Sequence, residues 1–185
     1  WDNNFYPLID KIANTGKPII ASLGLGEINR SKKLQKYLFD KWQALGHKNP
    51  GLAFLHCVCS YPTPMEDAGI IEIDKLNDLE VTVGYSDHTL GHLACCIAVS
   101  KGASIIEKHF TKNNKKKGYD HQISLDYEGM KELVKNIEAT EFMLSNNIKF
   151  LDVVRKNRKK FLRALVANCK IKKGEKFSEI NISAK

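Results

Sequence analysis

The sequence predicts an α/β fold that forms part of a (β/α)8 barrel, and three observations support this. Four short apolar runs alternate with longer segments whose apolar residues recur at helical spacing. The runs are almost continuously apolar, as expected for strands of a parallel sheet that is covered on both faces. Each run ends in side chains capable of chemistry, and in a barrel such strand ends converge on one mouth, whereas an open sheet builds its site at a single switch point.

The order of elements is four strand-then-helix units, which implies parallel strands with right-handed crossovers. The predicted strands are residues 18–24, 52–58, 81–86 and 104–110. The predicted helices are residues 27–46, 65–76, 90–100 and 126–144. Asp126 is the expected N-cap of the last helix. Four strands cannot close a barrel, so the sequence predicts about half of one.

The C-terminal part differs in character from these units. We expect the half barrel to span residues 1–146, a basic linker to span 147–162 and the truncated start of a second small domain to span 163–185. In this last segment a β-like run at 164–167 leads to the turn KKGE at 172–175.

Composition narrows the classes of protein. No run of eighteen apolar residues occurs, so no membrane span is expected. Five cysteines, an odd number without zinc-type spacing, indicate a reducing cytoplasm. The net charge of +8 is concentrated at 112–118 and 155–163 without interleaved aromatic residues, so we expect solvated surface rather than a nucleic-acid site. Attraction of a small anionic substrate is the alternative interpretation of this charge.

His88 and His109 are the strongest candidates for chemistry. Each follows an apolar strand, the two strands are consecutive, and neighbouring strands lie about 4.8 Å apart. Two imidazoles with open positions suit a divalent metal that polarises a carbonyl group. The alternative is that both histidines form hydrogen bonds that hold loops at the strand ends.

Other polar residues at the same strand ends allow two interpretations each. Ser86 either donates to a phosphate or carboxylate oxygen or satisfies a turn. Asp87 either orients His88 or, as we favour, caps the following helix at Thr89. Tyr61, in a loop stiffened by two prolines, either positions a sugar-like substrate or covers the barrel rim. Asp120 either binds a polyol hydroxyl or stabilises a turn.

Several of these motifs together resemble one enzyme family. The motifs are KPIIASLG, LHCVCSYPTP, VGYSDHTLG, IIEKHFT, DHQISL and the tail VANCKIKKGEKFSEINI. They resemble the N-acetylneuraminate (sialic acid) synthase family, which includes the NeuB-like legionaminate and spore-coat polysaccharide synthases. The resemblance implies strands five to eight of a (β/α)8 TIM barrel, followed by the start of an antifreeze-like (SAF) domain, in a protein that forms a domain-swapped homodimer.

The resemblance also implies a function. Such enzymes condense phosphoenolpyruvate with N-acetylmannosamine or a related N-acetylated hexose, giving a nonulosonic acid and phosphate. The implied cofactor is a divalent metal, with Mn²⁺ favoured over Mg²⁺ or Co²⁺. By motif position, His88 and His109 are metal ligands and Ser86 contacts phosphoenolpyruvate. Tyr61, Asp120 and, more loosely, Asp2 contact the sugar.

Three residues depart from the family pattern. Cys59 stands where an Asn or Ser that binds phosphoenolpyruvate is expected, and a thiol is a weaker hydrogen-bond donor. Leu23 replaces a threonine, and Tyr119 replaces a proline before Asp120. These departures motivate an alternative hypothesis, a non-catalytic sugar- or anion-binding protein of the same family.

Overall fold

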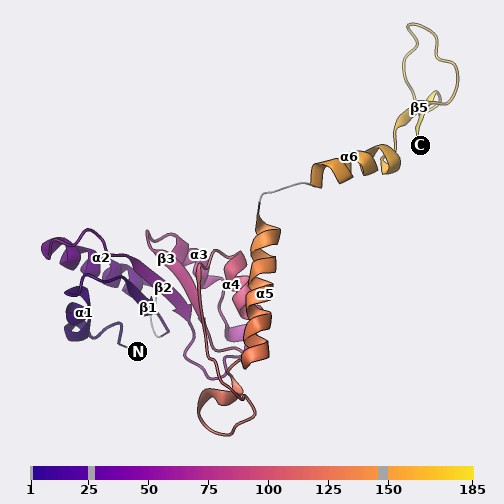
Figure 1. Ribbon diagram of the computed structural model, residues 1–185. Coiled ribbons are helices and arrows are strands. Elements are labelled where there is room, and N and C mark those ends of the chain that lie inside the picture. The colour runs from indigo at the N-terminus through magenta and orange to yellow at the C-terminus, as the bar shows by residue number, and fades with distance from the viewer. Residues whose placement is uncertain (1, 25–27, 146–149) are drawn as a thin grey trace. The chain divides into compact units, whose positions relative to one another are not determined.

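The computed structural model describes residues 2–24, 28–145 and 150–185 (Figure 1). The chain divides into two compact units, Trp1–Leu144 and Ser145–Lys185, and each is described by itself. No helix within the described ranges is long and apolar enough to cross a membrane.

The first unit is built on a four-stranded parallel sheet. Its strands are β1 (Ile19–Ser22), β2 (Leu52–Cys57), β3 (Thr82–Asp87) and β4 (Ile105–Lys108), in the spatial order β1-β2-β3-β4. All four predicted strands are confirmed, as are their order and direction. The register pairs Cys57 with Ser86 and Ser86 with Glu107, so the carboxyl ends of β2, β3 and β4 lie level.

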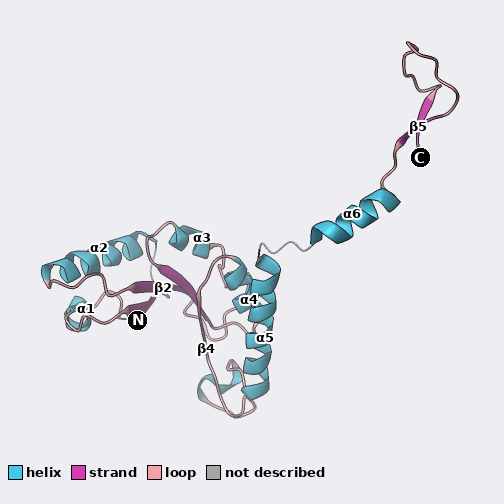
Figure 2. Ribbon diagram, turned by 45° about the horizontal axis from the view of Figure 1, so that its top comes forward, coloured by secondary structure: helices cyan, strands magenta, loops and turns pink. Residues whose placement is uncertain are grey.

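Helices cover one face of this sheet (Figure 2). They are α1 (Tyr6–Ala13), α2 (Ile28–Ala44), α3 (Glu72–Asn77), α4 (Leu93–Ser100) and α5 (Tyr127–Leu144). The core between helices and sheet contains Leu38 and Trp42 of α2, Phe54 of β2, Ile73 of α3 and Tyr85 of β3, each at most 1% exposed. The predicted helical spacing of Leu34, Leu38 and Trp42 is therefore the buried stripe of α2.

Two predicted helices differ from the structure. The helix predicted at 65–76 is a 3₁₀ turn at Met65–Asp67 followed by α3, because Gly69 between them has a φ of +57° that a helix does not allow. The helix predicted at 90–100 begins only at Leu93, after Gly91 at a φ of +77°. Asp87 is therefore not the N-cap of α4, and that part of the interpretation is wrong, although Asp87 Oδ1 does accept the Thr89 N–H at 2.8 Å. The predicted N-cap Asp126 is confirmed, because its Oδ1 accepts the Gly129 N–H at 3.0 Å.

The second unit contains α6 (Phe150–Phe161) and the antiparallel pair β5 (Leu165–Ala167) and β6 (Ile182–Ala184). The turn predicted at 172–175 is present, with the Glu175 N–H donating to the Lys172 carbonyl at 3.0 Å. Residues 147–149 of the predicted linker lie outside the described residues. The assignment of this unit to an SAF domain stays a prediction.

Candidate functional site

The alternation of side chains along the strands divides polar residues between the two faces of the sheet. The helix-covered face takes His56, Tyr85, Asp87 and Lys108; the rings of His56 and Tyr85 stack there, 5.7 Å apart. The period of two then assigns Cys57, Ser86 and Glu107, which pair in register, to the other face. Because His88 and His109 follow Ser86 and Glu107 by two residues, they continue this second face beyond the strand ends.

The structure brings His88 and His109 together, with Tyr61 beside them. The two imidazole centroids are 5.2 Å apart, and the Tyr61 ring centroid is 4.1 Å from that of His88 and 6.0 Å from that of His109. Asp120 lies at the rim of this group, with its Oδ2 3.6 Å from His109 Nδ1. Four of the predicted site residues are thus neighbours, although they come from three different loops.

A backbone carbonyl fixes the tautomer of His88. His88 Nδ1 lies 2.8 Å from the Val58 carbonyl oxygen, and since a carbonyl only accepts hydrogen bonds, Nδ1 carries the proton. The lone pair of the neutral ring is therefore on Nε2, which leaves this nitrogen free to bind a metal. His88 itself is 6% exposed, so this orientation is held by buried surroundings.

The two histidines could supply two of the ligands of a metal ion, and the other ligands would come from elsewhere. Among the described residues, no three His, Cys, Asp or Glu side chains are grouped so that they could hold an ion. Two imidazoles would leave several positions for water, substrate or further ligands, as catalytic metals require and structural metals do not. Metal ligation by His88 and His109 stays a prediction.

Glu107 is a site residue that the sequence-based prediction missed. The buried Ser86 hydroxyl donates to Glu107 Oε1 at 2.5 Å, so its proton is engaged by a carboxylate. To donate to a bound anion, Ser86 must rotate away from Glu107. The signal that could have identified Glu107 is its position two residues before His109, which places both on one face of a strand.

Behind the histidines, on the helix side, lies a buried ion pair. Lys108 Nζ is 2.8 Å from Asp87 Oδ2, and the two side chains are 1% and 0% exposed. Asp87 also accepts hydrogen bonds from the Tyr85 hydroxyl at 3.1 Å and the Thr89 N–H at 2.8 Å. Burial raises the pKa of the Asp87 carboxyl, but the hydrogen bonds from Lys108 and Thr89 outweigh burial and hold it below its usual range. Asp87 is a structural residue of this strand end.

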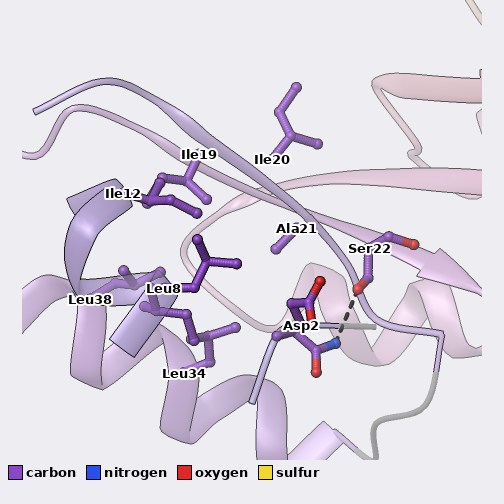
Figure 3. A pocket seen from close by; sticks show the side chains of 11 residues that line it. Asp2, Leu8, Ile12, Ile19, Ile20, Ala21, Ser22, Leu34 and Leu38 are labelled. Atoms are coloured by element: carbon purple, nitrogen blue, oxygen red, sulfur yellow. Dashed lines mark hydrogen bonds between the residues drawn. The ribbon is translucent and has the colours of Figure 1, made fainter. Parts of the chain in front are cut away.

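Asp2 and Leu23 lie away from the histidines, near β1. Asp2 lines an apolar pocket of about 200 Å³ at the β1 edge, between α1 and α2 (Figure 3), where the Asn3 amide donates to the Ser22 carbonyl at 3.1 Å. This pocket is separate from the histidines, which follow β3 and β4. Leu23 is 8% exposed and packs in the helix-side core, so this departure does not touch the site. The Tyr119 side chain lies outside the described part of the structure.

The fold and site define a parallel α/β half barrel with polar side chains gathered at its carboxyl edge. Residues 1–149 match the family model described as the NeuB family. The chain belongs to the NeuB family.

Curated relatives and a solved structure agree with this membership. The chain is 38% identical to a pseudaminic acid synthase and 35% identical to an N,N'-diacetyllegionaminic acid synthase, both of Campylobacter jejuni; the matches cover 99% and 97% of this chain and 51% and 53% of those proteins. The sialic acid synthetase of Leptospira borgpetersenii superimposes with a TM-score of 0.74 at 28% identity, over 86% of this chain and 55% of that one. The chain thus spans about half the length of these relatives.

Proposed function

We propose that this chain is the C-terminal half of the catalytic barrel of a sialic-acid-type synthase. The proposed reaction condenses phosphoenolpyruvate with an N-acetylated hexose, such as N-acetylmannosamine, to give a nonulosonic acid and phosphate. The observation that carries this proposal is the cluster of Tyr61, His88 and His109 at the ends of parallel strands in a chain of the NeuB family.

Each residue of the cluster has a proposed role. His88, through Nε2, and His109 would hold Mn²⁺, or Mg²⁺ or Co²⁺ in its place, and such an ion polarises a carbonyl oxygen as a Lewis acid. Ser86 and Cys59 would contact phosphoenolpyruvate. Glu107 would hold the Ser86 hydroxyl proton until substrate arrives. Tyr61 and Asp120 would contact the sugar, and Asp2, which lines the separate pocket at the β1 edge, would reach it only from that side.

The charge of the site supports the proposal that this chain forms only half of the barrel. The side chains that the four described strands direct away from the helices include Glu107 but no lysine or arginine. Phosphoenolpyruvate is a multiply charged anion, and such ligands are held by cationic donors. We infer that further strands supply these cations, in a protein that acts in the cytoplasm as a domain-swapped homodimer, without nucleic acid or membrane.

The test is phosphate release by the complete protein that carries this chain. With phosphoenolpyruvate, Mn²⁺ and a panel of N-acetylated hexoses, we expect release with at least one sugar and a loss of at least 100-fold in His109→Ala, as for other single catalytic groups. His92→Gln is the matched control, because His92 Nε2 accepts a hydrogen bond from Asn136 on α5 instead of facing the cluster. Absence of release with every sugar would refute the proposal.

A non-catalytic binding protein is the second candidate, and Cys59 favours it. A thiol at this position donates more weakly than the expected Asn or Ser. This candidate predicts that the complete protein binds a sugar or an anion but releases no phosphate. The Cys59→Asn variant separates the two, because gain of phosphate release in that variant alone would assign the lost activity to this residue.

A further inference from the structure

Cys57 and Cys59 bring two thiols together beside the candidate metal site. Cys57 is the last residue of β2, and Cys59 follows it by two residues in the next loop. The surroundings of Gly24 show that the two sulfur atoms lie close together. A Cβ at residue 24 would collide with the Cys59 sulfur and lie 3.0 Å from the Cys57 sulfur. Both sulfurs therefore occupy the space above one glycine.

The environment of these thiols differs from that of the other cysteines. Cys57 is 8% exposed, and its sulfur lies 3.8 Å from His88 Nδ1. Cys59 is partly exposed, so peroxide can reach it, but burial together with the neighbouring Cys57 thiol raises its pKa, so it reacts more slowly than a free cysteine. Cys95 and Cys96, the other close pair in sequence, are adjacent on α4, where the Cys95 thiol donates to Asp87 at 3.2 Å. Adjacent helical residues do not face each other, so only the β2 pair is arranged as a dithiol.

Val58 links this dithiol to His88. It lies between the two cysteines, and its carbonyl accepts the hydrogen bond that fixes the His88 tautomer. A bond between the two sulfurs would close a small ring that contains the Val58 peptide group. The Val58 carbonyl also accepts hydrogen bonds from the Ser60 N–H at 3.0 Å and the Thr63 hydroxyl at 3.5 Å. If ring closure turns this peptide group, it would disturb the hydrogen bond that aims His88 Nε2.

We propose that Cys57 and Cys59 form a redox-sensitive dithiol whose oxidation to a disulfide weakens metal binding at His88. The oxidant is a hydroperoxide. The peroxide transfers one oxygen to the more exposed Cys59 sulfur, giving a sulfenic acid and one water when hydrogen peroxide is used. The Cys57 sulfur then attacks the Cys59 sulfur, the S–O bond breaks, and the hydroxyl leaves as a second water with the Cys57 proton. Two thiols and one peroxide thus give one disulfide and two waters.

The disulfide is tested by mass spectrometry on the complete protein that carries this chain. Trypsin releases Cys57 and Cys59 in one peptide, residues 49–75, and Cys95 and Cys96 in another, residues 76–101. After hydrogen peroxide treatment and alkylation, we expect the first peptide to be lighter by two hydrogen atoms and unalkylated. The second should be alkylated as in the untreated sample once the chain is denatured. Equal alkylation of the first peptide before and after peroxide would overturn the proposal.

The effect of the disulfide on metal binding is tested with Mn²⁺ as the only ligand. This second test rests on the proposed function. We expect oxidation to raise the Mn²⁺ dissociation constant about 10-fold or more, as the loss of an orienting hydrogen bond does at metal sites. Dithiothreitol should restore the constant, and Cys59→Ser should make it insensitive to peroxide. Equal Mn²⁺ affinity with the disulfide formed would refute the link. If the reduced chain binds no Mn²⁺ but the disulfide forms, the dithiol is upheld and the metal site of the proposed function is refuted.

Discussion

Asp87 and Lys108 pair at 2.8 Å on the helix side of the sheet, and each directly precedes a candidate metal ligand in the chain. The pair joins β3 to β4 where Asp87 and Lys108 are register partners. Because side chains alternate along a strand, His88 and His109 leave on the opposite side. The buried Asp87–Lys108 ion pair on one side of the sheet thus helps to set the spacing of the two imidazoles on the other side.

Lys108→Met should destabilise the protein strongly. It leaves the Asp87 carboxylate buried without its cation, and breaking a buried pair in this way costs about 3–5 kcal/mol of the free energy of unfolding. Lys36→Met is the matched control, because the Lys36–Asp40 pair has side chains that are 78% and 62% exposed. That control should change stability by about 0.5 kcal/mol or less. Urea unfolding of both variants measures the difference, and equal losses would contradict a buried ion pair.

Tyr37 and Asp10 should give stability a measurable pH dependence. The Tyr37 hydroxyl donates to Asp10 Oδ1 at 2.6 Å, joining α1 to α2. This hydrogen bond, with help from Lys41, lowers the pKa of Asp10, and the same bond raises the pKa of Tyr37. A lowered carboxyl pKa contributes stability above the unfolded value of about 3.9 and loses it as pH falls through the folded value.

The variant Tyr37→Phe tests this pH dependence. The stability difference between wild type and variant should be full near pH 7, shrink below about pH 4, and also shrink above about pH 10 as the tyrosine ionises. Chemical denaturation at a series of pH values measures it. A difference that is constant from acid to alkali would show that the hydrogen bond is not formed.

Gly84→Ala should destabilise the sheet. A Cβ at residue 84 would collide with the Leu55 side chain and lie 2.5 Å from the Ile105 carbonyl oxygen, which belongs to the backbone and cannot yield alone. We expect a loss of about 1–3 kcal/mol, typical of an overpacked core. Gly46→Ala is not a suitable control: a Cβ there meets no atom, but the φ of +74° would strain an alanine. The loss of stability in Gly84→Ala, measured by thermal unfolding, is therefore compared with that in Ala139→Gly on α5. That change costs about 1 kcal/mol through helix propensity.

The sequence predicts the strands and the histidine pair well for a physical reason. Continuous apolar runs predict buried parallel strands, and the consecutive strands β3 and β4 end at the same level, which brings His88 and His109 side by side. Specific hydrogen bonds and ion pairs between strands were not predicted, because they depend on the register and on the side-chain rotamers. The pairing of Asp87 with Lys108 and the contact of Val58 with His88 join residues 21 and 30 positions apart. The breaks at Gly69 and Gly91 were missed because helical spacing alone does not reveal a positive φ.

The most direct test of the central claim is a Mn²⁺ titration of the complete protein that carries this chain. The electron paramagnetic resonance signal of the free ion measures how much Mn²⁺ is bound. We predict one saturable site in the reduced wild type, lost in both His88→Ala and His109→Ala and retained in His92→Gln. Retained binding in His88→Ala or His109→Ala, or equal loss in His92→Gln, would contradict a metal centre built by these two histidines.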